Sequence, residues 1–243
     1  MNKCPGQDSS KAQPENITCV NCGYVAEIFS DEIKVKCPKC KNLICRERMP
    51  SCVDWCKAAR DCIGEGNYKL YTKEKALFLK NKLIKEMEDY FGSDARRIAH
   101  AKKVMGFAEK ILKLEKADWN IVVPASILHD VGIKLAEEKY GSNAGYLQEK
   151  EGPEIARKIL LKLGVKKENI NEICQIIACH HSPGEIDSIN FKVLYDSDWL
   201  VNFGDELGNS GQEKIGRLID KVFLTKTGKA MAEGIYLKQK TEN

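Results

Sequence analysis

The chain has 243 residues, of which 43% are hydrophobic and 30% are charged, and its formal net charge is +4. This composition is typical of a soluble globular protein, and so small a net charge gives no sign of a dedicated nucleic-acid binder. The most apolar run, residues 121–128, is far shorter than the ~20 residues that a membrane-spanning helix needs. The first ten residues contain no apolar stretch typical of a signal peptide. We therefore expect a cytoplasmic protein without a membrane-embedded part.

Cysteine and histidine residues divide the chain into two parts. Nine of the 11 cysteines lie at or before Cys62, whereas all four histidines lie between His100 and His181. Thiols stay reduced in the cytoplasm, so clustered cysteines indicate metal binding before disulfides. We expect a cysteine-rich region over residues 1–66 and a second domain over residues 67–243.

The first region contains one short segment of alternating hydrophobicity, around Tyr24–Val35, and ends in a predicted linker at Ile63–Asn67. A unit of this size buries little apolar surface, and such units usually fold around a metal or disulfides.

From about Tyr71 onward the apolar residues recur at spacings of three and four, which is typical of amphipathic helices. The first helix is expected to end at Gly92, and Ser93–Asp94 offers an N-cap for the next one. Pro124 is expected to begin a helix that continues through His129 to Ile133. Gly152–Pro153 is expected to begin another, because proline suits the first turn of a helix.

That helix is expected to end at Gly164, and further helices are predicted over about 168–181, about 190–201 and in the last 30 residues. No strand pattern follows residue 70. The predicted fold class is therefore mainly α: an all-helical domain preceded by a small metal-stapled unit.

Four cysteines in the first region have the spacing of a structural zinc site. Cys19 and Cys22 form one C-x2-C pair, and Cys37 and Cys40 form another, 14 residues later. Zinc takes four thiolates in a tetrahedron at about 2.3 Å, and two residues between cysteines let a tight turn aim both sulfurs at one ion. Gly23 suits such a turn. The pattern resembles a zinc ribbon over about 25 residues. Zinc ribbons bind nucleic acid or protein, or only stabilise a fold, so the resemblance specifies no partner.

A second group of thiols is less specific. Cys52 and Cys56 are expected to share one helix face, Cys62 can join them after a turn, and Cys4 can reach them from the N-terminal arm. Four thiolates suit a second zinc or an iron–sulfur cluster. The alternative is that these are buried cysteines acting as small apolar residues.

The most informative polar residues of the second part are His100, His129, Asp130, the pair His180–His181, and Asp198. Asp130 lies in an otherwise apolar segment, and burying it without a partner would cost several kcal/mol. A divalent cation removes that cost. Imidazole and carboxylate ligands together suit Mn, Fe, Co, Ni or Zn.

These residues resemble the motif of the HD-domain metal-dependent phosphohydrolase superfamily over about residues 90–205. The family has a histidine on one helix, a His-Asp doublet on a later helix and a distant aspartate, which correspond here to His100, His129–Asp130 and Asp198. The resemblance implies an all-α fold and one or two divalent metals. It also implies hydrolysis of a nucleotide or related phosphoester.

Relatives that bind two metals carry further ligands between the doublet and the last aspartate. His180–His181 match the later of these, and Glu151 stands where the relatives usually have a histidine. Glutamate can bind a second metal, so two metals remain open beside a single metal with the histidine pair contacting phosphate.

The resemblance implies a metal-activated water as nucleophile, oriented by Asp130. Lys134, one turn after the doublet, is a candidate ligand of phosphate, and Arg96 and Arg97 are weaker ones. Two alternatives remain: an HD-fold di-iron oxygenase with nearly the same ligands, or a non-catalytic sensor of a metal or ligand. In the sensor, the zinc ribbon would contact a protein or nucleic acid.

Overall fold

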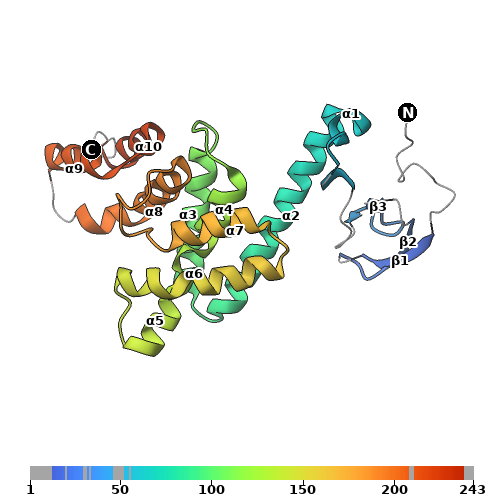
Figure 1. The fold of residues 1–243 in the computed structure, drawn as a ribbon, viewed down its shortest axis with the longest axis horizontal. Coiled ribbons are helices and arrows are strands. Elements are labelled where there is room, and N and C mark those ends of the chain that lie inside the picture. The colour runs from blue at the N-terminus through green and yellow to red at the C-terminus, as the bar shows by residue number, and fades with distance from the viewer. Residues whose placement is uncertain are drawn as a thin grey trace. The chain divides into compact units, whose positions relative to one another are not determined.

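The computed structural model describes residues 13–19, 21–29, 32, 34–45, 52–54, 56–207 and 211–237. The chain divides into two compact units, Met1–Lys73 and Glu74–Asn243 (Figure 1).

The first unit contains two antiparallel hairpins. Strand β1 (Pro14–Thr18) pairs with β2 (Val25–Phe29), and β3 (Lys34–Lys36) pairs with β4 (Leu43–Cys45). Side chains of β2 alternate between exposed and buried, with Ala26 and Ile28 inside, which confirms the period-2 pattern read from the sequence.

In each hairpin, one of the C-x2-C pairs lies in the turn between the two strands. Cys19–Cys22 connects β1 to β2, and Cys37–Cys40 connects β3 to β4. In both turns the residue after the second cysteine has a left-handed backbone, at Gly23 (φ 71°) and Lys41 (φ 62°). Its N–H donates to the carbonyl of the first cysteine, at 2.8 and 2.9 Å. The two turns therefore repeat one geometry, and Gly23 fills the role expected of it.

The segment that follows differs from the sequence prediction. The 3-10 helix η3 (Cys52–Asp54) ends before Cys56, and α1 spans Ala59–Ile63, so Cys52 and Cys56 do not share one helix. The helix α2 begins at Glu65 and runs to Phe91, so the linker expected at Ile63–Asn67 is wrong. Only Gly64 separates α1 from α2, and its φ of 79° gives the left-handed backbone that breaks one helix from the next.

All regular elements in the described residues of the second unit are helices, which confirms the predicted all-α class. Its elements after α2 are α3 (Ala95–Ile111), α4 (Trp119–Leu128), the 3-10 helix η4 (His129–Val131), α5 (Gly132–Tyr140), α6 (Gly145–Lys162), α7 (Lys167–Ile177), α8 (Ile189–Leu207), α9 (Gln212–Val222) and α10 (Lys226–Tyr236) (Figure 1).

Several of the predicted helix ends are confirmed. Gly92 and Gly164 follow α2 and α6 with φ of 62° and 69°, the left-handed conformation that glycine tolerates. The Asp94 carboxylate caps α3 by accepting from the Arg97 N–H at 3.1 Å.

The two prolines expected to begin helices lie inside them instead. Pro124 is in α4, which begins at Trp119, and Pro153 is in α6, which begins at Gly145. An internal proline costs about 3 kcal/mol through one lost hydrogen bond and a clash. In α4 this cost is offset by burial, since every residue from 121 to 128 is buried.

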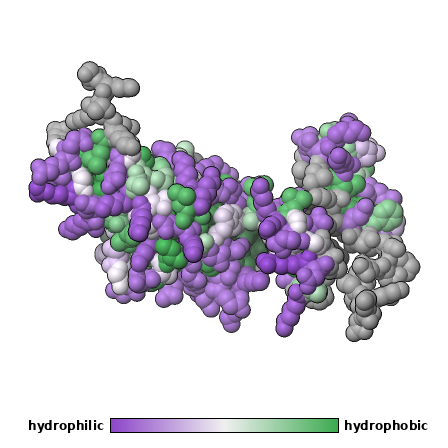
Figure 2. Space-filling model, turned by 90° about the horizontal axis from the view of Figure 1, so that it is seen from above, coloured by the Kyte–Doolittle hydropathy of each residue, from purple (hydrophilic) through white to green (hydrophobic). Residues whose placement is uncertain are grey.

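Helix α4 is the centre of the second unit. It contacts α3, α7 and α8, and it is apolar on all sides, as a fully buried helix must be. The face shown in Figure 2 is largely hydrophilic, with hydrophobic residues in separate patches. No helix in the described part of the chain combines the length and apolarity that crossing a membrane requires.

Candidate metal centre

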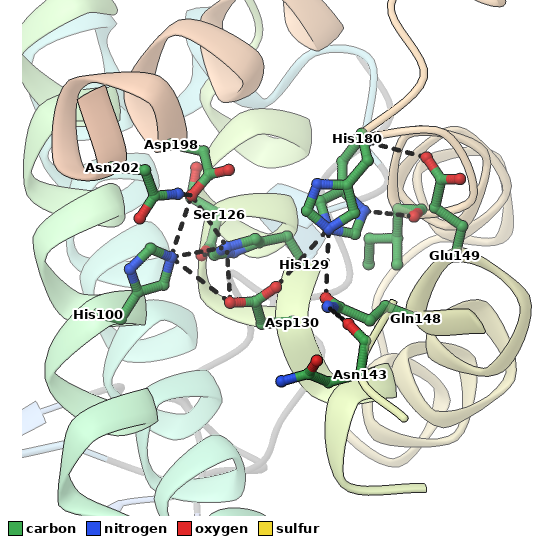
Figure 3. Close-up of polar contacts among 12 residues, drawn as sticks. His100, Ser126, His129, Asp130, Asn143, Gln148, Glu149, His180, Asp198 and Asn202 are labelled. Carbon is green, nitrogen blue, oxygen red and sulfur yellow. Dashed lines mark hydrogen bonds and ion pairs between the residues drawn. The ribbon is translucent and has the colours of Figure 1, made fainter. Parts of the chain in front are cut away.

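The polar cluster lies where the buried helix α4 ends. At His129 the α-helix α4 is followed directly by the 3-10 helix η4, which carries both His129 and Asp130. His100 comes from α3, Asp198 from α8, and His180 and His181 from the turn after α7. Four separate segments thus direct side chains to one place (Figure 3).

The first ligand set consists of His100, His129, Asp130 and Asp198. The Nε2 atom of His100 lies 3.3 Å from His129 Nε2, 3.0 Å from Asp198 Oδ1 and 3.4 Å from Asp130 Oδ2. The Nε2 atom of His129 lies 3.3 Å from Asp130 Oδ2 and 3.6 Å from Asp198 Oδ1. The two imidazoles and the Asp130 carboxylate therefore bring their ligand atoms within 4.8 Å of one another, and Asp198 lies beside both imidazoles.

These distances suit a divalent cation. Ligand atoms about 2.1 Å from an ion lie about 3.0 Å from one another in an octahedron and about 3.4 Å in a tetrahedron. His129 is also oriented as a ligand, because its Nδ1–H donates to the Ser126 carbonyl at 2.9 Å and leaves the Nε2 lone pair facing the cluster.

His129 and the carboxylates of the cluster shift one another's pKa values. Burial alone would lower the pKa of His129, but Asp130 and Asp198 hold that pKa well above its ordinary value. Burial alone would raise the pKa of Asp130, but His129 and His180 hold it well below its usual range. The carboxylates are thus ionised and compensated by positive charge, which a bound dication would supply in place of protons.

A second set shares Asp130 and adds His180 and His181. The His180 Nδ1–H donates to the Ile177 carbonyl at 2.8 Å, the same contact to the third residue before it that His129 makes. Its Nε2 atom is buried, lacks a hydrogen-bond partner within the described residues and lies 3.6 Å from Asp130 Oδ1. Leaving such an atom unpaired costs about 1–3 kcal/mol, so an unpaired Nε2 aimed at a carboxylate fits a metal ligand.

Two predicted site residues lie apart from these sets. The Glu151 oxygens accept from Lys139 Nζ at 2.6 Å and from Tyr140 Oη at 2.7 Å. The exposed Lys134 directs its amino group to the Tyr90 carbonyl at 3.3 Å.

Three residues that the sequence prediction did not name as ligands or supports also face the cluster. Gln148 Oε1 lies 3.2 Å from His181 Nε2, and the Asn202 amide donates to Asp198 Oδ1 at 2.9 Å. Asn143 lines the same cavity of about 440 Å³, together with Arg96. Asn202 lies one helical turn after Asp198 on α8, so spacing alone would have identified it.

The four cysteines of the first unit form a separate centre. Cys19 and Cys40 are 3.6 Å apart at sulfur, as are Cys22 and Cys37. Sulfurs at about 2.3 Å from a tetrahedral zinc lie about 3.8 Å apart, so the arrangement fits that ion.

The pKa values of two of these thiols are shifted from the ordinary value for cysteine. Hydrogen bonds from the Asn42 backbone and the Asn21 side chain lower the pKa of Cys40 to about 6. Zinc binds the thiolate form, which Cys40 favours, whereas burial and the neighbouring thiols raise the pKa of Cys22 to about 12.

The second thiolate site stays a prediction. Cys4 lies outside the described residues, and only the backbone of Cys52 and Cys62 is described. Cys56 is half-buried with a free thiol.

The family model for the HD domain matches residues 97–220, which is 124 of the 243 residues and includes His100, His129, Asp130, His180, His181 and Asp198. A solved structure described as a predicted HD superfamily hydrolase, from an uncultured Thermotogales bacterium, aligns with 65% of this chain and 84% of its own, at 26% identity and a TM-score of 0.49. No curated protein matches the chain significantly.

Proposed function

The chain belongs to the HD-domain superfamily of metal-dependent hydrolases, and from this premise we propose that it hydrolyses a nucleotide or a related phosphoester. The observation that carries the proposal is the first ligand set, His100, His129, Asp130 and Asp198. All of its members except the buried His129 line the cavity. Phosphoester hydrolysis needs a nucleophile and a positive charge beside the phosphate, and this site can hold an ion that provides both.

The ion would be Mn, Fe, Co, Ni or Zn, held by the nitrogen and oxygen atoms of the first set. When bound, it supplies a water of lowered pKa and neutralises charge on the phosphate oxygens. The fixed tautomer of His129 and the amide of Asn202 on Asp198 hold these ligands in place before the ion enters.

Asp130 has a further role, as an orienting group. One of its oxygens faces His100 and His129, and the other faces His180. It therefore lies between the two histidine groups, which supports a role for Asp130 in directing the attacking water.

Arg96 is the best-placed cation for the substrate phosphate. Its side chain is exposed at the cavity, and within the described residues it makes no ion pair, whereas Arg97 is held by Asp94 at 2.9 Å and Glu137 at 2.6 Å. Lys134 can contribute only after its amino group leaves the Tyr90 carbonyl.

The cysteine centre is proposed to hold a structural zinc through Cys19, Cys22, Cys37 and Cys40. Four thiolate ligands leave no open position for a substrate. The site favours neither a nucleic-acid nor a protein partner for this unit.

A phosphohydrolase panel tests the proposal. Wild-type protein is assayed with Mn, Co, Ni, Mg or Fe(II) against nucleoside mono- and triphosphates, cyclic nucleotides, dinucleoside polyphosphates and a chromogenic phosphoester. We expect metal-dependent hydrolysis by the wild type. Arg96→Ala should weaken it mainly by raising KM, whereas Arg157→Ala, the same change outside the cavity, should leave KM unaltered.

Absence of hydrolysis by folded, metal-loaded protein across the panel would contradict the proposal. Oxygen consumption with a diol or phosphonate under the same conditions would favour the di-iron oxygenase instead.

A further inference from the structure

Asp130 separates two groups of ligand atoms with different chemistry. Its Oδ2 atom faces His100 and His129, and its Oδ1 atom lies 3.6 Å from His180 Nε2. The first group has a second carboxylate, Asp198, whereas the second group has His180 and His181.

Gln148 borders the second group through a hydrogen bond with His181. Its Oε1 atom lies 3.2 Å from His181 Nε2, within the 3.0 to 3.6 Å range that separates ligand atoms in the first group. Its amide nitrogen donates to the Asn143 carbonyl at 2.6 Å, which turns the oxygen toward the histidines (Figure 3). An amide oxygen is a competent ligand for Mn²⁺ or Mg²⁺.

The neighbouring carboxylates are occupied elsewhere. Glu151 accepts from Lys139 and Tyr140, and Glu149 accepts from the His181 N–H at 2.9 Å and the Ser182 hydroxyl at 3.0 Å. Among the described residues around the second group, Asp130 is therefore the carboxylate that supplies it with negative charge.

We propose that Gln148, rather than Glu151, is a ligand of a second cation position formed with Asp130, His180 and His181. This position binds its cation more weakly than the first, because a neutral amide replaces a charged or imidazole ligand. The inference rests on the proposed function, since it concerns the same site. The buried, unpartnered Nε2 of His180 is the independent sign that this second group takes a ligand.

Equilibrium titration of the full chain with MnCl2, following free Mn²⁺ by electron paramagnetic resonance, tests the proposal without a substrate. Mn²⁺ prefers oxygen and nitrogen ligands, so the cysteine centre stays silent. Wild type should bind in two steps, the second at least about 10-fold weaker. Gln148→Leu should weaken the second step by roughly 10–100-fold and spare the first.

Gln148→Glu keeps the side-chain shape and adds a charged ligand, so it should tighten the second step by about 10-fold or more. Glu151→Gln is the matched control and should leave both steps within about 3-fold. The proposal is overturned if both Gln148 variants titrate as wild type, if Glu151→Gln removes the second step, or if wild type binds a single Mn²⁺. An inactive protein that still binds in two steps would refute the proposed function but not this inference.

Discussion

Replacing Gly132 by alanine tests the close packing that holds the site together. A Cβ at this position would lie 2.3 Å from the Gln148 carbonyl oxygen and 2.8 Å from the Gly152 nitrogen, both backbone atoms of α6. Restoring ordinary contact requires α5 and α6 to separate by about 1 Å. Overpacking of this kind costs about 3 kcal/mol, and the better helix propensity of alanine returns up to about 1 kcal/mol.

The net loss of about 2 kcal/mol should lower the Tm of the helical unit by roughly 4–8 °C, measured by circular dichroism at 222 nm. Gly106→Ala is the matched control, because Gly106 lies within α3 and a Cβ there meets no atom within 4 Å. That variant should melt at or slightly above the wild-type temperature. If Gly132→Ala also melts at or above wild type, the described approach of α5 to α6 is incorrect.

Three further predictions concern other parts of the chain. Chelation of zinc, or Cys37→Ser, should make residues 13–45 sensitive to protease and leave the helical unit intact, because the small core around the four cysteines depends on the metal. The control Cys179→Ser, in the helical unit, should not change the protease sensitivity of residues 13–45. Burial raises the pKa of Asp196 to about 6, so the folded state holds a proton that the unfolded state releases above about pH 4. The free energy of unfolding should therefore fall by roughly 1–3 kcal/mol as pH rises from 4 to 6, and Asp196→Asn should remove this slope in urea titrations. Gly145→Ala would add a Cβ 2.9 Å from His181 Cδ2, so it should displace the His181 ring and weaken Mn²⁺ binding without unfolding the protein. Unchanged Mn²⁺ binding would contradict the close contact between Gly145 and His181.

Local signals in the sequence predicted much of the fold. Apolar spacing identified the helices, and Gly92, Asp94 and Gly164 marked their ends, because caps depend on one or two neighbouring residues. The two C-x2-C pairs likewise predicted the turns that close the hairpins.

The errors arose where distant packing outweighed local preference. Pro153 suits a first turn, yet α6 extends two turns further back to Gly145. Glu151 was predicted as a ligand because it stands where the relatives usually have a histidine, and a matching sequence position does not show which side chains already contact that carboxylate. Only the folded structure shows that Glu151 is held by Lys139 and Tyr140.

The first ligand set is proposed to be a metal-dependent hydrolytic site. The most direct measurement compares metal content and chromogenic phosphoester hydrolysis in wild type, His129→Ala and Asp130→Ala at matched folding. We predict that wild type hydrolyses the ester in proportion to bound divalent metal and that both variants lose the metal of this site and the activity together. Hydrolysis that persists in both variants without metal would contradict the assignment of this site.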